Sequence, residues 1–509
     1  MSPVAAGALT LERLRGEGEA FFTEISREYY LAHAGLKATA DLQPIYVKYA
    51  DILGPDALAF TLDMFRGSTE GSEEHRSARL LLDWTAESQS SRQLVSLDER
   101  EIAWEGSAVV DVDQGRRIQY EAVSIEMANA ADRRDRHAIE AARAKLVQSG
   151  LAPIRRERTQ RERDITEQLG LAAGYNQTWE LLSGISLDGL RAECEQFLRD
   201  TDALWNEVLP EFAKRVLGMT PAELTRADAL ALFRAREFDA YFPPARMEES
   251  IARQVREMGV DPLASGRVIL DTSEREGKRG RAFCSPVRIP DEVYLVLRPH
   301  GGQSDWTTFL HELGHALHFA YMRPDLAFEY RCLGDSSITE GYAMLFDHRM
   351  EDAGWLKRYT ELGATNLQPF VRASGFEELH FLRRYCAKLI YEVQMYATDD
   401  WNTVPDLYVD VLTSATTFRY DRADAFVDVD ARFYAARYLR AWQLQALINE
   451  TLVERYDMDW WRNPRAGPWI CSALFGEGQR ELAHEQAQRV AGKPLSFAPL
   501  VRAVERMLG

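Results

Sequence analysis

The sequence lacks three features that would each point to a particular class of protein. It contains no uninterrupted apolar run of about 18 or more residues, which a membrane-spanning helix requires. Its 5 cysteines are odd in number, widely spaced and without a C-x-x-C pair, so neither a disulfide framework nor a cysteine metal site is indicated. Its formal net charge of −18 offers no concentrated positive surface for polyphosphates. We therefore expect neither a membrane nor a nucleic acid as a partner.

The first ten residues lack the basic segment and apolar core of a signal peptide, and the cysteines look like reduced thiols. Cytoplasmic location is the resulting expectation. One basic stretch, residues 133–163, is interrupted throughout by glutamate and aspartate. This mixture favours a solvated helical face with ion pairs over a binding surface for polyanions.

The chain of 509 residues is 46% hydrophobic, which is enough to bury a large core in more than one subdomain. Apolar residues recur at the spacing of helices over most of its length, so a mainly α fold is predicted. The longest such segments are residues 8–33, 117–150, 187–213, 376–398 and 434–456. No Gly/Ser-rich linker separates them, so the subdomains should pack tightly.

Residues 267–299 are the exception to this helical pattern. Three short apolar segments, 268–272, 282–284 and 293–298, have the composition of strands and are separated by polar turns. Pro299 cannot donate a ladder hydrogen bond and should end the third strand. An edge strand here would let an extended peptide pair through its backbone. The alternative is a hairpin that only covers the core.

The sequence His311-Glu312-Leu313-Gly314-His315 follows within a helix predicted over 304–322. On a helix, residues four apart differ by about 40° in azimuth, so both imidazoles project from one face. Such a pair can bind one metal ion, and Glu312 beside it can reach a metal-bound water as the general base of a zinc peptidase.

Glu340, twenty-five residues beyond His315, is the candidate for the third metal ligand. It lies in a helix predicted over 335–353, whose later residues Asp347 and His348 are candidates for supporting a ligand imidazole. Alternatively, Ser337 and Glu340 have the spacing of a capping box, although Asp335 could cap this helix instead. Gly314 costs about 1 kcal/mol within a helix, so it suggests close approach of another backbone.

Together these segments resemble the thimet oligopeptidase and oligoendopeptidase F family of zinc metallopeptidases. The resemblance is carried by Gly277 to Cys284 (G-K-R-G-R-A-F-C), the strand to Arg298, the motif H-E-L-G-H-A-L-H and Glu340. It covers residues 271–350 closely and the other helical regions only in general character. A related architecture occurs in the angiotensin-converting enzyme family, to whose late helix residues 437–450 are similar.

The resemblance implies a two-lobed helical fold with a deep channel and one zinc ion per chain. His311, His315 and Glu340 would be its ligands, Glu312 the base, and short peptides the substrates. We accordingly expect an N-terminal helical lobe over 1–200 and a catalytic region over 201–509, which also holds the C-terminal helices.

The segment Phe433-Tyr434-Ala435-Ala436-Arg437-Tyr438 resembles the family's late tyrosine motif. The resemblance implies that Tyr438, or Tyr434 second, stabilises the tetrahedral intermediate. Two departures weaken this assignment, because Ala436 replaces the middle tyrosine and the usual preceding histidine is absent. Independently, Tyr434, Tyr438 and Trp442 form a stripe that often indicates core packing.

Candidate substrate contacts are Tyr294, Val296 and Arg298 near the third strand, together with Arg437. Alternative activities are a peptidyl-dipeptidase or a carboxypeptidase, for which Arg298, Arg437 or Arg440 could hold the terminal carboxylate of the substrate. A non-catalytic peptide-binding protein with a structural zinc is a third possibility, but such a site needs no base.

Overall fold

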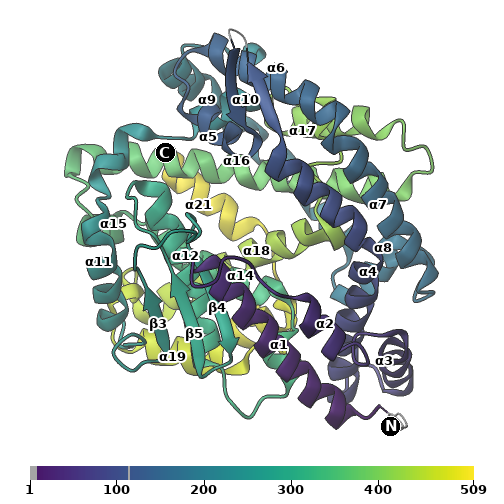
Figure 1. Cartoon of the computed structure of the whole chain (residues 1–509). Coiled ribbons are helices and arrows are strands. Elements are labelled where there is room, and N and C mark those ends of the chain that lie inside the picture. Colours follow the sequence, from purple (N-terminus) through teal and green to yellow (C-terminus); the bar gives the residue numbers. More distant parts are fainter. Residues whose placement is uncertain (1–8, 113–114) are drawn as a thin grey trace. The chain divides into compact units, whose positions relative to one another are not determined.

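The protein is mainly α-helical, as the apolar spacing predicts. The computed structural model describes residues 9–112 and 115–509, and it is 70% helical and 5% strand. Helices therefore form nearly all of the framework, and the strands are confined to two small sheets. Figure 1 shows the helices and strands along the chain.

The chain forms two compact units, each assembled from three separate segments. Unit 1 comprises Met1–Gln89, Phe238–Ala364 and Arg440–Leu495, and unit 2 comprises Ser90–Glu237, Thr365–Leu439 and Ser496–Gly509. Neither unit coincides with a continuous segment such as 1–200 or 201–509, because the chain leaves and re-enters both. Boundaries between the units fall within α4 (Glu73–Ser107) and α18 (Tyr434–Tyr456) along the sequence. The deep channel between two lobes stays a prediction.

Unit 1 holds the predicted sheet and the H-E-x-x-H helix. Its other α-helices include α1 (Leu11–His33), α2 (Gln43–Lys48), α3 (Pro55–Gly67), α11 (Pro244–Glu257), α13 (Phe328–Cys332), α15 (Ala353–Tyr359), α19 (Ala466–Ala473) and α20 (Ala483–Ala491). Burial of apolar side chains from distant segments holds it together. One core cluster joins Leu14 and Phe21 of α1 to Leu81 of α4 and Phe328 of α13.

The sheet of unit 1 contains β3 (Val268–Asp271), β4 (Phe283–Arg288) and β5 (Glu292–Val296), in the order β3-β5-β4. β5 pairs parallel with β3 and antiparallel with β4, so the third strand along the chain is central and not an edge strand. This corrects the expectation that a peptide could add to the strand carrying Tyr294 and Val296, since both sides of its backbone are already paired. The edge strands are β3 and β4.

The helix α12 (Gln303–Tyr321) follows this sheet and closely matches the predicted range 304–322. Its apolar residues recur every three or four positions and are buried, among them Trp306, Leu310, Leu313 and Leu317. It packs against α14 (Ser336–Asp347), which ends earlier than the predicted 353 because a tight turn at residues 348–351 follows.

Gly314 lies at a close approach of α12 and α14. A Cβ atom at Gly314 would lie 2.6 Å from Cα of Ala343 and 2.7 Å from the carbonyl oxygen of Tyr342. The close backbone approach anticipated from this glycine is therefore present. It brings the third-ligand candidate near the two histidines.

Unit 2 is built on long helices and buried ion pairs. Its elements are β1 (Val109–Val112), β2 (Arg116–Gln119), α5 (Val123–Asn129), α6 (Arg133–Ser149), α7 (Leu151–Gln168), α8 (Tyr175–Ser183), α9 (Leu187–Phe212), α10 (Arg226–Leu232), α16 (Ala364–Ala397), α17 (Val404–Thr416) and α21 (Ala498–Leu508). Arg136 pairs with Asp228, and Arg143 with Asp424, all four side chains being buried. The basic stretch 133–163 is thus helical and largely ion-paired.

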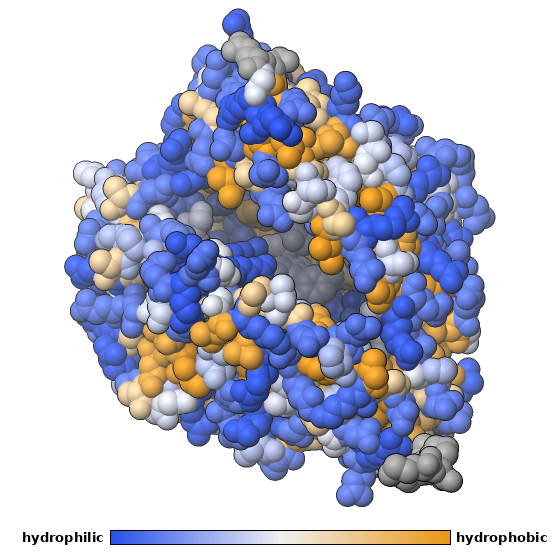
Figure 2. All heavy atoms as spheres, in the orientation of Figure 1, coloured by the Kyte–Doolittle hydropathy of each residue, from blue (hydrophilic) through white to orange (hydrophobic). Residues whose placement is uncertain are grey.

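Hydrophilic residues cover most of the face drawn in Figure 2, and apolar residues form separate groups on it. Within residues 9–112 and 115–509, no helix combines the length and the apolar character needed to cross a membrane.

Candidate metal centre

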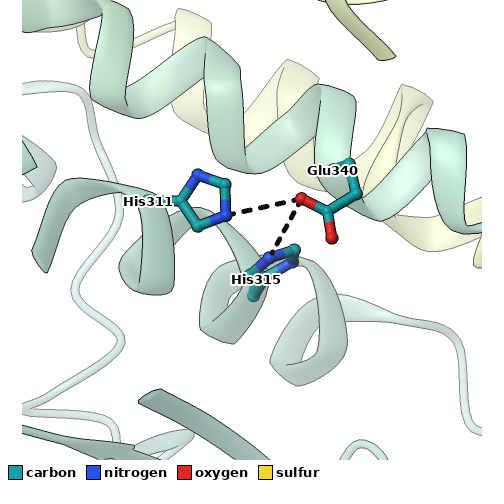
Figure 3. Close-up of side chains that lie close together, drawn as sticks. All are labelled: His311, His315 and Glu340. Atoms are coloured by element: carbon teal, nitrogen blue, oxygen red, sulfur yellow. Dashed lines mark ion pairs between the residues drawn. The ribbon is translucent and has the colours of Figure 1, made fainter. Parts of the chain in front are cut away.

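Two imidazoles and one carboxylate converge between α12 and α14. His311 and His315 project from consecutive turns of α12, and Glu340 reaches them from α14 (Figure 3). Their ligand atoms all lie within 4.8 Å of one another, and the three side chains form a group that could hold a metal ion. The structure therefore brings together the three residues that the sequence singled out as ligands.

The distances within this group suit a shared ion better than direct hydrogen bonds. Glu340 Oε2 lies 3.4 Å from His311 Nε2 and 3.7 Å from His315 Nε2. Two ligand atoms at about 2.1 Å from one tetrahedral ion lie about 3.4 Å apart. Good hydrogen bonds between nitrogen and oxygen are shorter, most often about 2.9 Å. The residues thus fit a tetrahedral ion of the size of zinc.

Asp347, at the end of α14, orients His311. Its Oδ2 atom lies 2.8 Å from Nδ1 of His311, and its Oδ1 atom lies 2.6 Å from Nδ1 of His348. Burial lowers the pKa of His311, but Asp347 and Glu340 outweigh burial and raise this pKa to about 10. Of the two proposed supporting residues, Asp347 contacts His311 directly and His348 contacts Asp347.

Thr339 orients the second imidazole. Its Oγ1 atom lies 2.8 Å from Nδ1 of His315. Burial is the main cause that lowers the pKa of His315 to about 4, although Glu340 opposes this shift. Because Nδ1 of each histidine is engaged, Nε2 of each ring is directed toward Glu340. Thr339 has no recognisable feature in the sequence that would indicate this role, except its position next to Glu340.

Glu312 is held in place by a contact with the sheet. The backbone N–H of Cys284 in β4 donates a hydrogen bond of 2.8 Å to Glu312 Oε2. Burial raises the pKa of Glu312, while His311 and the Cys284 N–H oppose this rise. A carboxyl group with a raised pKa is a stronger base than an exposed one, as a proton acceptor near neutrality requires.

Glu340 does not cap its helix. Asp335 is the N-cap of α14, and its side chain accepts a hydrogen bond from the backbone N–H of Ser337. Glu340 lies one turn further along, with its side chain buried and directed at the histidines. Of the two alternatives for this glutamate, the geometry favours the ligand over the capping box.

Most of the residues in and beside the sheet that were candidates for substrate contacts are buried or already contact other residues of the protein. Val296 is fully buried, and Tyr294 stacks on Tyr30 of α1 with ring centroids 3.8 Å apart. Arg298 lies beyond β5 and is exposed, and its Nε atom donates to Glu274 at 2.8 Å. Strand pairing with a peptide at β5 is excluded by its central position, and Arg298 already has an ion-pair partner.

The three candidates from the late helix, Tyr434, Arg437 and Tyr438, belong to unit 2. Tyr438 stacks on Tyr385 with ring centroids 5.6 Å apart, whereas Tyr434 is 38% exposed. Tyr434 is thus not a core residue. The contribution of these residues to a site with His311 stays a prediction.

Neither a model of a known protein family nor a curated protein matches this chain.

Proposed function

We propose that the protein is a zinc-dependent metallopeptidase that hydrolyses short peptides, and that it belongs to the family it resembles. The observation that carries this proposal is the placement of Glu312. Glu312 follows His311 in α12, its carboxylate interacts electrostatically with His311 and Glu340, and a backbone N–H from the sheet fixes one of its oxygens. A purely structural metal site has no use for such a base and usually fills four positions with protein ligands.

His311 and His315 would hold the zinc ion through Nε2, and Glu340 would hold it through its carboxylate. Two imidazoles with one carboxylate are a ligand set that suits zinc among the common divalent ions. When bound, zinc supplies a Lewis acid that polarises a carbonyl group and acidifies water. Asp347 and Thr339 would keep both rings in the tautomer that leaves Nε2 available.

Glu312 would carry the proton through both halves of hydrolysis. The Cys284 N–H occupies Oε2, so Oε1 is the atom that would take a proton from the attacking water. The same carboxyl group would then pass this proton to the departing amine, because acid and base roles alternate across the reaction. The raised pKa of Glu312 supports both transfers.

The developing negative charge on the substrate oxygen requires a hydrogen-bond donor. By the family resemblance, the phenol of Tyr438 is preferred for this role and that of Tyr434 is second. Arg437, next to Tyr438 in the sequence, is the candidate for a contact with the substrate. A peptidyl-dipeptidase or carboxypeptidase activity on the same framework remains the main alternative, and a non-catalytic peptide-binding protein is the other.

The direct test uses the zinc-loaded protein and a mixed library of short peptides, with products identified by mass spectrometry. We expect defined products from the wild type and nearly none from Glu312→Gln, which should retain one zinc ion per chain by elemental analysis. Glu312→Gln is a matched control because it keeps the shape of the side chain while removing the base. Absence of products from the zinc-loaded wild type would refute peptidase activity, and equal turnover by both proteins would refute the role of Glu312.

A further inference from the structure

The loop between β3 and β4 is fixed in place by its own lysine and backbone. Lys278 is buried, and its ammonium group donates to the carboxylate of Asp271 and to the carbonyl oxygens of Asp271 and Ser273 at 2.9 to 3.1 Å. These three contacts use all three of its donors. The backbone N–H of Arg279 donates to the carbonyl oxygen of His33 in α1 at 2.8 Å. The loop therefore holds a defined position ahead of β4.

The two arginines of this loop, Arg279 and Arg281, are exposed. Across residues 9–112 and 115–509, neither guanidinium group forms an ion pair or a hydrogen bond. The neighbouring Arg275 and Arg298 differ from them, because they are paired with Asp271 and Glu274. An exposed arginine without a protein partner keeps its five donors for another anion.

Of the two arginines of the loop, Arg281 is the nearer in sequence to the backbone contact with Glu312. It lies three positions before Cys284, whose N–H contacts Glu312, and three residues span at most about 11 Å. The positive charge of Arg281 also interacts with the Glu312 carboxylate. The charge of Arg279 acts instead on His33, where it adds to burial in lowering the pKa of that histidine. Two similar arginines thus face different neighbours.

We propose that Arg281 binds a carboxylate group of the peptide substrate at the rim of the site. Its planar guanidinium presents paired N–H donors that match a carboxylate, which lysine does not offer. Every unmodified short peptide carries such a group at its C-terminus, and an acidic side chain offers the same chemistry. This inference rests on the proposed peptidase function and adds a preference for substrates with a carboxylate near the cleaved bond.

The test compares three peptides that share one core sequence and differ in their carboxylates. The first has a free C-terminus, the second an amidated C-terminus, and the third an amidated C-terminus with a glutamate as its last residue. For the zinc-loaded wild type, we expect kcat/KM to be higher for a peptide with a carboxylate than for the neutral peptide. The first and third peptides distinguish the terminal carboxylate from an acidic side chain.

Arg281→Gln should reduce this preference about tenfold or more, mainly through KM, because a charge-assisted contact is lost. Arg281→Lys should restore part of it, since the charge remains but the paired donors do not. Arg279→Gln is the matched control, two residues away in the same loop, and should keep the wild-type preference. Binding provides a second readout, because Glu312→Gln should bind the carboxylate peptide more tightly than Glu312→Gln with Arg281→Gln, as measured by calorimetry.

Three results would overturn the inference about Arg281. These are equal kcat/KM of the wild type for all three peptides, an equal loss for all three in Arg281→Gln, or the same loss of preference in Arg279→Gln. An equal loss would mean that Arg281 acts only through the charge of Glu312. Failure of the zinc-loaded wild type to cleave any of the peptides would instead refute the proposed function itself.

Discussion

The hydroxyl oxygen of Thr339 lies 2.8 Å from Nδ1 of His315, on the residue just before Glu340. One turn of α14 thus supplies a candidate metal ligand and orients another that belongs to α12. Asp347 gives His311 the equivalent contact with a charged group, also at 2.8 Å. The two imidazoles therefore differ in the group that contacts Nδ1, which is a neutral hydroxyl for His315 and a carboxylate for His311.

We predict that Thr339→Val weakens zinc binding about 10- to 100-fold, because the His315 ring loses the contact that fixes its orientation. Thr339→Ser keeps the hydroxyl and should restore most of the affinity. Competition with a chromophoric chelator measures both constants. Equal affinities for the valine and serine variants would show that the hydroxyl has no part in orienting the ring.

Gly314→Ala should destabilise the protein by about 1–3 kcal/mol despite the higher helix propensity of alanine. The new methyl group would lie 2.6 Å from Cα of Ala343, which is backbone and cannot move aside cheaply. Gly16 in α1 is the matched control, because a Cβ atom there meets nothing within 4 Å. Gly16→Ala should be neutral or stabilise by up to about 1 kcal/mol. Urea denaturation followed by circular dichroism gives both values, and similar effects at the two positions would contradict the packing argument.

Tyr438→Phe should lower kcat by about 10²- to 10³-fold with little change in KM, as expected for a donor used only in the transition state. Tyr434→Phe, four residues earlier in the same helix, is the comparison and should have the smaller effect. Steady-state kinetics on one peptide of the library decides between them. Unchanged kcat in Tyr438→Phe would assign that ring to packing against Tyr385.

The stability of the protein should fall in acid partly because of His380 in α16. This ring stacks on Phe233 with centroids 4.5 Å apart, and its burial, aided by Arg384 and Arg383, lowers its pKa from 6.5 to about 3. Between these values the unfolded chain binds a proton that the folded protein excludes. The contribution of His380 to stability is therefore complete above pH 6.5 and decreases as the pH falls toward 3.

His380→Phe keeps an aromatic ring without a titrating nitrogen. We expect the free energy of unfolding of this variant to fall less steeply with decreasing pH, by up to about 1.4 kcal/mol per pH unit. Urea denaturation of both proteins between pH 4 and pH 7 measures the two slopes. Identical slopes would show that His380 titrates alike in the folded and unfolded states.

Local spacing in the sequence was sufficient to predict the helix of His311 and His315 and the tight contact at Gly314. Both follow from helical periodicity and from the cost of glycine, which depend on neighbouring residues alone. Glu340 and Asp347 were also candidates before the structure, because the helix that carries them has a recognisable start at Asp335.

The strand order and the contacts of Thr339 and Arg281 could not be predicted from local spacing in the sequence. β5 is central because β3 pairs with it in parallel, and no residue of β5 encodes the identity of its second neighbour. The contact between Thr339 and His315 depends on how α12 packs on α14. The position of Arg281 depends on the attachment of its loop to Asp271 and α1. Such relationships arise only when distant segments pack together.

Strand β4 is a potential site of aggregation, and its sequence limits this risk. It is an edge strand, and an unpaired edge is a template on which a second chain can add by backbone pairing. The outward N–H of Cys284 is already donated to Glu312, and Pro286, at the next outward position, has none to donate. A register shift between Pro286 and Arg288 further disrupts the outer row of backbone groups. The same strand that positions Glu312 thereby resists growth of the sheet into intermolecular aggregates.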